Sequence, residues 1–347
     1  DRPVCILTAT LSLLAQYEDL GIPVIRGRAN FNCRFGGTCE NDGDDSCATD
    51  ECPYDLAKVR AIRAPVFATT YAAFLSDQTV RAQAPIVVCD EGQRMDDLLS
   101  LWYGVTLTVP PTVRPKPPTV PDLALWRLWA NQTSPWGDQP STYARNKRAL
   151  RKLYHLADRT DWVTTCSAGR LEVRPLWPSD AWTHAMSYAE SVLIQSATLY
   201  GGHFFAKMLG VEDYAVLRLD SPFDVEQRPV YIIPVANLSY RSTDGDWWRV
   251  GQACTDIVKA AGITKGLIHV SSRNQVNRMR SMFNDLLPNV RVLYHLLETR
   301  RDRQQLFDSF RKLPAPIWMV SSSAYEGEDF PNDQLRVQIL AKLRYGD

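Results

Sequence analysis

The sequence has no long apolar run, no signal-peptide pattern and no excess of either charge. No apolar stretch approaches the roughly 20 residues that a helix needs to span a bilayer. The first residues, DRPVCILTAT, lack a charged, apolar and cleavable signal pattern. The 39 Lys and Arg residues balance 39 Asp and Glu residues, which argues against a protein that coats nucleic acid over its whole surface but leaves room for a local basic groove. We therefore expect an intracellular, cytoplasmic protein with no membrane partner.

The chain is long enough for about two domains with a sizeable core. It has 347 residues, of which 45% are hydrophobic and 22% charged, as is ordinary for a globular protein. Strand-like and helix-like patterns alternate along it, and this alternation predicts a parallel sheet with helical crossovers. In the first part we expect helices at 11–20 and 54–64, and strands at 4–10, 22–27, the start of 65–75, 86–89 and 191–199.

A proline-rich connector interrupts this alternation. Residues 109–121 hold six prolines and are predicted to be stiff and extended. Because the strand pattern resumes at 191, residues 100–180 are predicted to be an insertion within the first α/β domain. A second α/β unit follows, with strands expected near 229–234, 266–271, 290–294, 316–321 and 335–341.

Two adjacent carboxylates, Asp90 and Glu91, follow the apolar segment at 86–89 directly. The carboxyl end of a central parallel strand is where an open α/β sheet binds its ligands. There, Asp90 could hold Mg²⁺ through bound water, and Glu91 could orient or deprotonate the water that attacks a nucleotide γ-phosphate. The alternative is an ordinary strand that ends in a polar loop, because an Asp-Glu pair after an apolar run is common.

Four of the eight cysteines lie close together, with the spacing C-x5-C-x7-C-x4-C. In a reducing compartment such a group favours metal ligation over disulfides. The spacing is looser than the C-x2-4-C pairs of structural zinc sites and suits a [4Fe–4S] cluster better, with zinc and free or disulfide-bonded cysteines as alternatives. The acidic segment between them cannot pack a core, so a metal centre gives it a reason to be ordered. The predicted ligands are Cys33, Cys39, Cys47 and Cys52.

A basic helix is predicted at 143–159. Leu150, Leu153, Tyr154 and Ala157 recur at helical spacing, which indicates a surface helix that packs through this apolar side. A helix that also follows a phosphate backbone is the alternative. Its basic residues are Arg145, Lys147, Arg148, Arg151 and Lys152.

Two polar groups follow other predicted strands. Ser196 and Thr198 come at the end of the strand at 191–199, where small hydroxyls could bridge a carboxylate and a neighbouring domain, although such residues are often only turn formers. Glu326, Gly327 and Asp329 follow the strand at 316–321, and their carboxylates could hold a ribose or sense phosphates. An ordinary acidic loop is the alternative.

The order of these segments along the chain is more specific than any one of them. GRANFNC, the four cysteines, CPYDLAK, DEGQ, SATL, LDSPFD and YEGEDFPNDQLRVQILAKL together resemble the iron–sulfur helicases of superfamily 2, the XPD/DinG-like group, and most of all its bacterial and phage DinG-like members. The resemblance extends from residue 4 to 343. It implies two RecA-like parallel-sheet motor domains, with an iron–sulfur insertion and an arch-like helical insertion in the first.

The implied activity is ATP-driven 5′→3′ translocation on single-stranded DNA with duplex separation. The resemblance also implies a monomer that acts on single-stranded and forked duplex DNA, in DNA repair, in the cytoplasm of a bacterial or phage-infected cell. The expected divisions are residues 1–108 and 181–220 for the first motor domain, about 27–60 for the iron–sulfur insertion, 109–180 for the arch-like insertion and 221–347 for an incomplete second motor domain.

The resemblance also implies roles for single residues. In DEGQ, Asp90 would hold the Mg²⁺ of Mg-ATP and Glu91 would be the hydrolytic base. Gly92 replaces the usual alanine, a change we expect to be mild, and Gln93 replaces the usual histidine, which leaves open how this position couples hydrolysis to DNA. QSAT and EGED match the third and fifth motifs, which makes Ser196, Thr198, Glu326, Gly327 and Asp329 the expected nucleotide-binding residues. Gln16 lies in the DNA-contacting segment, and the expected DNA contacts are Thr8, Thr10, Arg28, Arg148, Arg151 and Ser271.

Two motifs of this family do not occur in the sequence. These are the phosphate loop G-x-x-x-x-G-K-[ST] and the closing Q-x-x-G-R-x-x-R motif with its arginine finger. We expect both to lie just outside the two ends of the sequence, so that residues 1–347 alone would not hydrolyse ATP. The alternatives are a non-catalytic iron–sulfur DNA-binding module that has lost its ATPase activity, and an RNA-remodelling helicase, because such motors follow the sugar-phosphate backbone with little readout of base identity.

Overall fold

The computed structural model divides the chain into two compact units, Asp1–Leu219 and Asp220–Asp347. The structure describes residues 2–32, 52–137, 140–156, 161–167, 169–199, 201–222, 224–227, 229–239, 241–296, 300–324 and 330–342. No helix among these residues is both long enough and apolar enough to cross a membrane.

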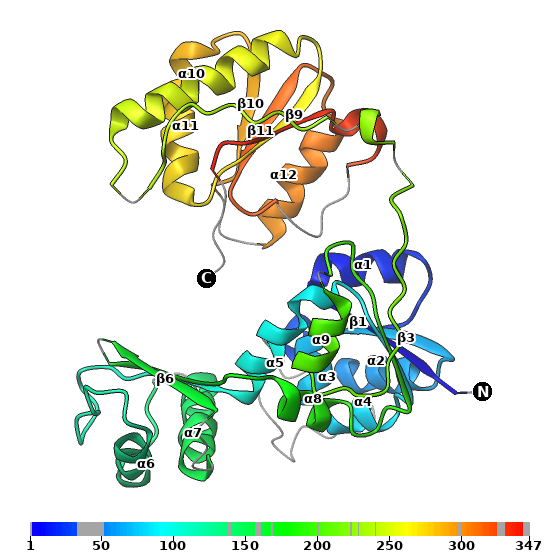
Figure 1. Ribbon diagram of the computed structural model, residues 1–347, viewed down its shortest axis with the longest axis vertical. Helices are drawn as coiled ribbons and strands as arrows, with labels where there is room; N and C mark the ends of the chain where they lie inside the picture. Colours follow the sequence, from blue (N-terminus) through cyan, green and yellow to red (C-terminus); the bar gives the residue numbers. More distant parts are fainter. Residues whose placement is uncertain are drawn as a thin grey trace. The chain divides into compact units, whose positions relative to one another are not determined.

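The first unit is built on a five-stranded parallel sheet, as the strand–helix alternation predicts (Figure 1). Across the sheet its strands are β2 (Val24–Ile25), β3 (Val66–Thr70), β1 (Val4–Thr8), β4 (Ile86–Cys89) and β8 (Ser191–Ile194). Its helices are α1 (Leu11–Asp19), α2 (Pro53–Ile62), α3 (Tyr71–Ser76), α4 (Gln78–Ala82), α5 (Met95–Tyr103), α8 (Ser179–Ala185) and α9 (Gly202–Met208), with 3₁₀ turns η1 (Arg28–Asn30) and η3 (Gly92–Arg94).

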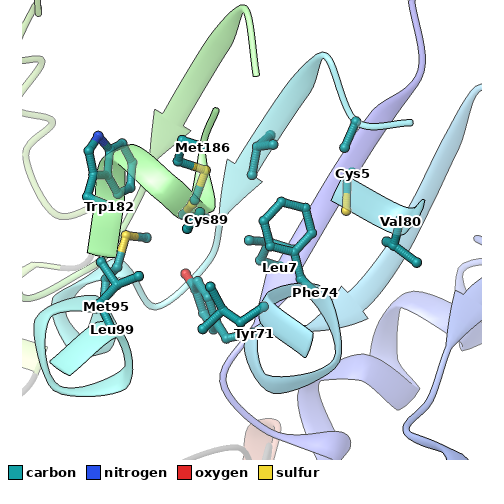
Figure 2. Close-up of a cluster of buried hydrophobic side chains, with 14 of the residues drawn as sticks. Cys5, Leu7, Tyr71, Phe74, Val80, Cys89, Met95, Leu99, Trp182 and Met186 are labelled. Atoms are coloured by element: carbon teal, nitrogen blue, oxygen red, sulfur yellow. The ribbon is translucent and has the colours of Figure 1, made fainter. Parts of the chain in front are cut away.

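The core of this unit lies between the sheet and its helices. Leu7 and Cys89 are fully buried on neighbouring strands, and Phe74 of α3 lies beside them in the same cluster (Figure 2). Polar side chains at helix starts fix where the crossovers begin. Thr10 accepts a hydrogen bond from the Leu13 amide (3.2 Å), and Asp77 accepts two at the start of α4. The helices that follow the strands therefore begin at capping residues that can be recognised in the sequence.

The insertion contains a sheet as well as helices, which corrects the expectation of a helical insertion. Its elements are β5 (Val105–Thr108), α6 (Leu123–Gln132), α7 (Pro140–His155), β6 (Trp162–Ser167) and β7 (Arg170–Pro175). The strands form a three-stranded antiparallel sheet in the order β5-β7-β6, with α6 and α7 on one side of it (Figure 1). Because β5 pairs with β7 and not with the parallel sheet, residues 105–108 belong with the insertion by their pairing.

The insertion has its own apolar core, which explains its tryptophans. Trp126 and Trp129 of α6 are buried with Leu150 and Leu153 of α7. Tyr154, which we expected on this apolar side, is 45% exposed, because it follows Leu153 by one position and so points about 100° away around the helix. The third leucine of the stripe is Leu156.

The second unit is a four-stranded parallel sheet between two layers of helices (Figure 1). Across the sheet its strands are β10 (Arg291–Tyr294), β11 (Ile317–Ser321), β9 (Lys265–His269) and β12 (Val337–Leu340). Its helices are α10 (Asp244–Ala260), α11 (Arg273–Leu286) and α12 (Arg300–Lys312), with 3₁₀ turns η4 (Val225–Gln227) and η5 (Asn332–Gln334). Along β11, Trp318 packs in the cluster with α10 and α11, while Met319 packs in the cluster with α12. Both faces of the sheet are therefore covered, as in parallel sheets generally.

One expected strand of the second unit is absent. Residues 229–234 run without strand pairing, and Val230 and Ile232 are 87% and 90% exposed. The apolar pattern of this segment favours a strand, but none of the described strands pairs with it. The prediction of a strand at 229–234 was therefore wrong.

Candidate active site

Three strands of the first sheet end at the same edge. Leu7, Cys89 and Ile194 are neighbours in register across β1, β4 and β8. The residues that follow are tied together as well, because the Asp90 amide donates to the Leu7 carbonyl (2.9 Å) and the Gln195 amide donates to the Cys89 carbonyl (3.0 Å). Asp90 and Gln195 therefore stand side by side at the carboxyl edge of the sheet, where open α/β sheets bind ligands.

Both carboxylate oxygens of Asp90 accept hydrogen bonds. The Tyr17 hydroxyl donates to Oδ2 (3.1 Å), and Gln195 Nε2 donates to Oδ1 (3.3 Å). The Glu91 amide also donates to Oδ1 (3.1 Å). The Asp90 side chain is thus held by donors from three segments of the chain.

Tyr71 fixes the backbone of Asp90. Its hydroxyl donates to the Asp90 carbonyl (2.8 Å), and burial raises the pKa of Tyr71 well above its usual value, so this donor keeps its proton. Burial also raises the pKa of the Cys89 thiol, which therefore stays protonated and unreactive. Figure 2 shows Tyr71 and Cys89 in the buried cluster under this edge. The backbone at this strand end is accordingly held from below by a buried hydroxyl.

A chain of hydrogen bonds links Glu91 to the end of β8. Gln93 Nε2 donates to Glu91 Oε2 (2.7 Å), and Gln93 Oε1 accepts from the Ser196 hydroxyl (2.5 Å). Ser196 Oγ in turn accepts from the Thr198 amide (2.9 Å). The two motifs that the sequence singles out, DEGQ and SAT, are therefore in direct contact through Gln93.

Gly92 lies too close to β8 for a larger residue, which corrects the expectation that alanine would be an equivalent residue there. A Cβ on Gly92 would lie 2.3 Å from Ile194 Cγ2 and 3.4 Å from the Gln195 carbonyl oxygen. The close approach places the Gly92 amide 3.0 Å from the Gln195 carbonyl oxygen, to which it donates. Gly92 thus allows the DEGQ segment to dock on the end of β8.

The expected DNA contacts at the start of the chain lie on the turn between β1 and α1. Thr8 is fully buried and its hydroxyl donates to the Thr10 carbonyl (3.1 Å), so its side chain shapes this turn. Thr10 begins α1, and Gln16 is exposed on the same helix. Thr8 and Thr10 lie at and just after the carboxyl end of β1, at the same sheet edge as Asp90.

Arg28 lies shortly before the cysteine segment in the sequence. Its guanidinium lies over the Tyr54 ring (5.0 Å to the centroid), and Phe31 meets the same ring edge-on (5.6 Å). The Tyr54 hydroxyl and Lys58 Nζ both donate to Asp77 Oδ2 (3.2 and 2.6 Å). Although burial opposes it, the hydrogen bond and charge of Lys58 lower the pKa of Asp77. Residues that precede the cysteine segment, Arg28 and Phe31, therefore contact Tyr54, which follows it.

Most of the predicted metal site lies outside the described residues. Cys33, Cys39 and Cys47 fall in 33–51, and only Cys52 is described; it is partly buried and packs against the core of the first unit. In the described part of the chain, no three His, Cys, Asp or Glu side chains gather as a possible metal site. Glu326, Gly327 and Asp329 also lie outside the described residues.

The basic helix α7 divides its charged residues between two roles. Arg145, Lys147, Arg148 and Arg151 are exposed on the insertion. Lys152 is not part of this exposed group, which corrects the expectation for it. Its Nζ donates to the Trp102 carbonyl (2.6 Å) and lies over the Tyr103 ring (5.8 Å), and burial lowers its pKa to about 8. Lys152 therefore ties the insertion to α5.

Ser271 belongs to the second unit. It follows β9, and its amide and hydroxyl both donate to Gln275 Oε1 (2.8 and 3.0 Å). It thus stands at the carboxyl edge of the second sheet, at the start of α11.

The sequence did not reveal Tyr17, Tyr71 or Gln195 as residues of the site. Tyr17 and Tyr71 lie far from Asp90 in the sequence, and neither belongs to a recognisable motif. Gln195 precedes Ser196 directly, and the register of β8 against β4 would have placed it beside Asp90.

No model of a protein family matches the chain, and no curated protein matches it. Solved structures do. One, titled XPD_Helicase, has 14% sequence identity, covers 97% of this chain and 77% of its own, and has a TM-score of 0.53. Another, titled XPD_APO, has 15% identity, covers 96% of this chain and 73% of its own, and has a TM-score of 0.51.

The chain has an XPD-like fold. The predicted fold class, α/β with two RecA-like parallel-sheet domains, is thereby confirmed. In that XPD-like fold, Asp90, Glu91, Gln93 and Ser196 gather at the carboxyl edge of the first sheet.

Proposed function

We propose that this protein is an ATP-dependent helicase or translocase of single-stranded nucleic acid. The observation that carries the proposal is the chain Glu91–Gln93–Ser196 beside Asp90, at the ligand-binding edge of an XPD-like sheet. An ordinary turn does not require two carboxylates held in defined orientations, so this arrangement favours a ligand-binding role. The bacterial or phage DinG-like subtype, 5′→3′ direction on DNA, action on forked duplexes, a monomeric state and a role in DNA repair belong to the same proposal.

The carboxylate of Asp90 fits a magnesium ion, because hard oxygen ligands at the end of a parallel strand are what Mg²⁺ uses in nucleotide sites. Bound there, Mg²⁺ would neutralise charge on the β- and γ-phosphates of ATP. Asp90 would hold the ion, with its side chain oriented by Tyr17 and Gln195. Ser196 and Thr198 stand at the adjoining strand end, and we assign Glu326, Gly327 and Asp329 to the nucleotide as well.

Glu91 is the proposed base. Gln93 donates to its Oε2, which leaves Oε1 to accept a proton from the attacking water. The Gln93 carboxamide can donate and accept at once, so Glu91 and Ser196 are held together without a titrating group between them. We propose that this bridge replaces the imidazole that the family has here.

The nucleic acid would be held by cations and aromatic faces rather than by base identity. We propose that Arg28, Arg148 and Arg151 contact its phosphates, together with Thr10 and Ser271. Thr8 is fully buried, which corrects the expectation that it contacts nucleic acid directly, and its hydroxyl instead shapes the turn that carries Thr10. The cysteines would hold a [4Fe–4S] cluster, and Cys52, at the start of α2, is the one ligand described. Elemental analysis of anaerobically purified protein decides this point, with about four irons per chain for the cluster and one zinc for the alternative.

Replacing Glu91 by Gln tests the proposed function. The change removes the base and keeps a side chain that Gln93 can still contact. In the full-length protein, nucleic-acid-stimulated phosphate release should fall at least about 10²-fold, the effect typical of losing a general base, while nucleotide binding survives. Phosphate release with a malachite-green readout and binding of a fluorescent ATP analogue measure the two quantities.

The matched control is Glu190→Gln, which removes an exposed carboxylate that pairs with Arg2 far from the site. It should leave hydrolysis unchanged. If Glu91→Gln hydrolyses ATP as the unchanged protein does, Glu91 is not the base. If the full-length unchanged protein hydrolyses no ATP but binds single strands, the non-catalytic module is correct, and a preference for RNA over DNA strands would favour the RNA-remodelling alternative.

A further inference from the structure

Tyr17 reaches the proposed cation site from a helix that carries no motif for it. It lies on α1, and its hydroxyl donates to Asp90 Oδ2 at 3.1 Å, across 73 positions of sequence. The contact is selective for one oxygen, because Oδ1 already accepts from Gln195 and from the Glu91 amide. The two oxygens of Asp90 are therefore in different environments.

An ionised carboxylate offers about four lone-pair positions. Two donors occupy Oδ1 and one donor occupies Oδ2. The fourth lone-pair position, which these three donors do not use, is therefore on Oδ2, next to the Tyr17 hydroxyl. A cation held by Asp90, directly or through water, would use this oxygen, and Tyr17 decides which way the oxygen points.

The contact with Tyr17 favours the charged form of Asp90. The Tyr17 hydroxyl donates to Oδ2, and a hydrogen bond donated to a carboxylate supports its charged form, which is the form that binds a cation. A hydrogen bond to a metal-binding carboxylate is typical of the groups that surround a metal site and orient its ligands.

We propose that Tyr17 is a positioning residue that orients the cation-binding oxygen of Asp90, so that the placement of α1 sets the cation affinity of the site. The inference rests on the proposed function, since it takes Asp90 as the residue that holds Mg²⁺. It adds a residue outside DEGQ and SAT, on the helix that Thr10 begins. The affinity of the site for a divalent cation therefore depends on the segment in which the resemblance puts nucleic-acid contacts.

The test is a titration with Mn²⁺, which takes the same oxygen ligands as Mg²⁺ and loses its free six-line electron paramagnetic resonance signal when bound. The full-length protein is used with a non-hydrolysable ATP analogue, as the unchanged protein and as three variants. Tyr17→Phe removes one hydroxyl, and Asp90→Asn removes the charge. Tyr231→Phe removes a hydroxyl from a tyrosine that is 79% exposed in the second unit and serves as the matched control.

Tyr17→Phe should bind Mn²⁺ about tenfold more weakly, the lower end of the effect expected for losing a hydrogen bond to a metal-binding carboxylate. Tyr231→Phe should match the unchanged protein, and Asp90→Asn should lose the Mn²⁺ site. Thermal unfolding without metal should show that all four proteins are folded, which separates positioning from misfolding.

Two results would contradict us, and they can be told apart. If Tyr17→Phe binds Mn²⁺ as tightly as the unchanged protein while Asp90→Asn does not bind it, the role of Tyr17 is wrong and Asp90 stands. If Asp90→Asn binds Mn²⁺ like the unchanged protein, the assignment of Asp90 in the proposed function fails, and the inference for Tyr17 fails with it.

Discussion

Glu91 adopts a left-handed backbone conformation (φ 54°, ψ 44°) that residues with a Cβ take uncommonly. Such a conformation costs about 1–2 kcal/mol and persists only where the surroundings enforce it. Here the Asp90 and Gly92 amides are both bonded to neighbouring strands. This left-handed conformation redirects the chain just after β4 and brings the Glu91 side chain next to Gln93, at the position where we place the base.

Gly92→Ala is expected to destabilise the first unit. Its Cβ would lie 2.3 Å from Ile194 Cγ2, so β8 or the DEGQ segment must shift. Overpacking of this kind costs about 1–3 kcal/mol in the free energy of unfolding, which urea denaturation measures.

Gly27→Ala is the control for Gly92→Ala. Gly27 has φ −59° and ψ 151°, which alanine adopts readily, and the nearest atom to its added Cβ is Asn30 Nδ2 at 3.7 Å. It should change stability little. Ile194→Ala should partly relieve Gly92→Ala, so that the double variant loses less stability than the two single losses together. Additive losses would show that Ile194 is not the obstacle.

Residues with a local motif were the ones that the sequence could locate. Asp90, Ser196 and Gln93 follow strands that the apolar pattern marks, and the structure brings them together. Tyr17 could not be found, because its contact depends on how α1 packs over the sheet. The need for glycine at 92 depends on the distance to Ile194, which the sequence does not contain.

At the scale of elements, α7 shows how one helix serves two neighbours. Its leucines pack on the insertion's sheet, and Lys152 reaches the last turn of α5, where its Nζ meets the Trp102 carbonyl. The helix therefore fixes the insertion to the first unit through a lysine that the sequence groups with the exposed cations.

The stability that involves Lys152 should depend on pH. Burial lowers the pKa of Lys152 in the folded protein to about 8, from the ordinary lysine value of 10.5. Between these two values the unfolded chain binds more protons than the folded one, so the free energy of unfolding rises as pH rises from about 8 to 10.5. We expect about 1 kcal/mol, a fraction of the full linkage, because the side chain still meets water.

Urea denaturation across this pH range, with Lys152→Met beside the unchanged protein, isolates the contribution of Lys152. The variant should lose the pH-dependent difference. Lys147→Met, which removes an exposed lysine from the same helix, should keep it. Equal pH profiles for all three proteins would mean that Lys152 titrates normally.

Periodic patterns predicted most elements but not their partners. The all-apolar run at 86–89 indicated a central parallel strand, and β4 lies inside its sheet with a paired strand on each side. The run at 316–321 indicated a strand, and β11 forms there. The run at 229–234 has the same character, yet it remains exposed, because pairing depends on a neighbouring strand that no local pattern can supply. For the same reason the sequence missed the antiparallel sheet of the insertion.

Because the whole molecule has a net charge of zero, its electrostatic attraction for nucleic acid must come from local basic surfaces. On α7 the exposed Arg145, Arg148 and Arg151 recur every three positions and so share a face. Replacing Arg148 and Arg151 by Glu should weaken binding of single-stranded DNA alike for all sequences. It should also make the salt dependence shallower by at least about 1.4 in log K against log salt, at about 0.7 for each phosphate contact on a single strand.

Fluorescence anisotropy with labelled oligonucleotides across a salt series measures both effects. The control makes the same change in net charge at Lys259 and Lys312, which are exposed at the ends of α10 and α12. An unchanged salt dependence in the α7 variant, or an equal loss in the control, would show that α7 does not contact the strand.

The insertion joins the first unit through paired strands. Val105 of β5 lies opposite Val173 of β7, just after α5 ends at Tyr103 and shortly before α8 begins at Ser179. The chain therefore enters and leaves the insertion at one place, the junction where β5 begins beside the end of β7. Recombination at these two neighbouring positions can lengthen, shorten or exchange the insertion, while the parallel sheet keeps its register. In evolutionary terms the insertion can be exchanged as a unit, and the strands β5 and β7 form its point of attachment.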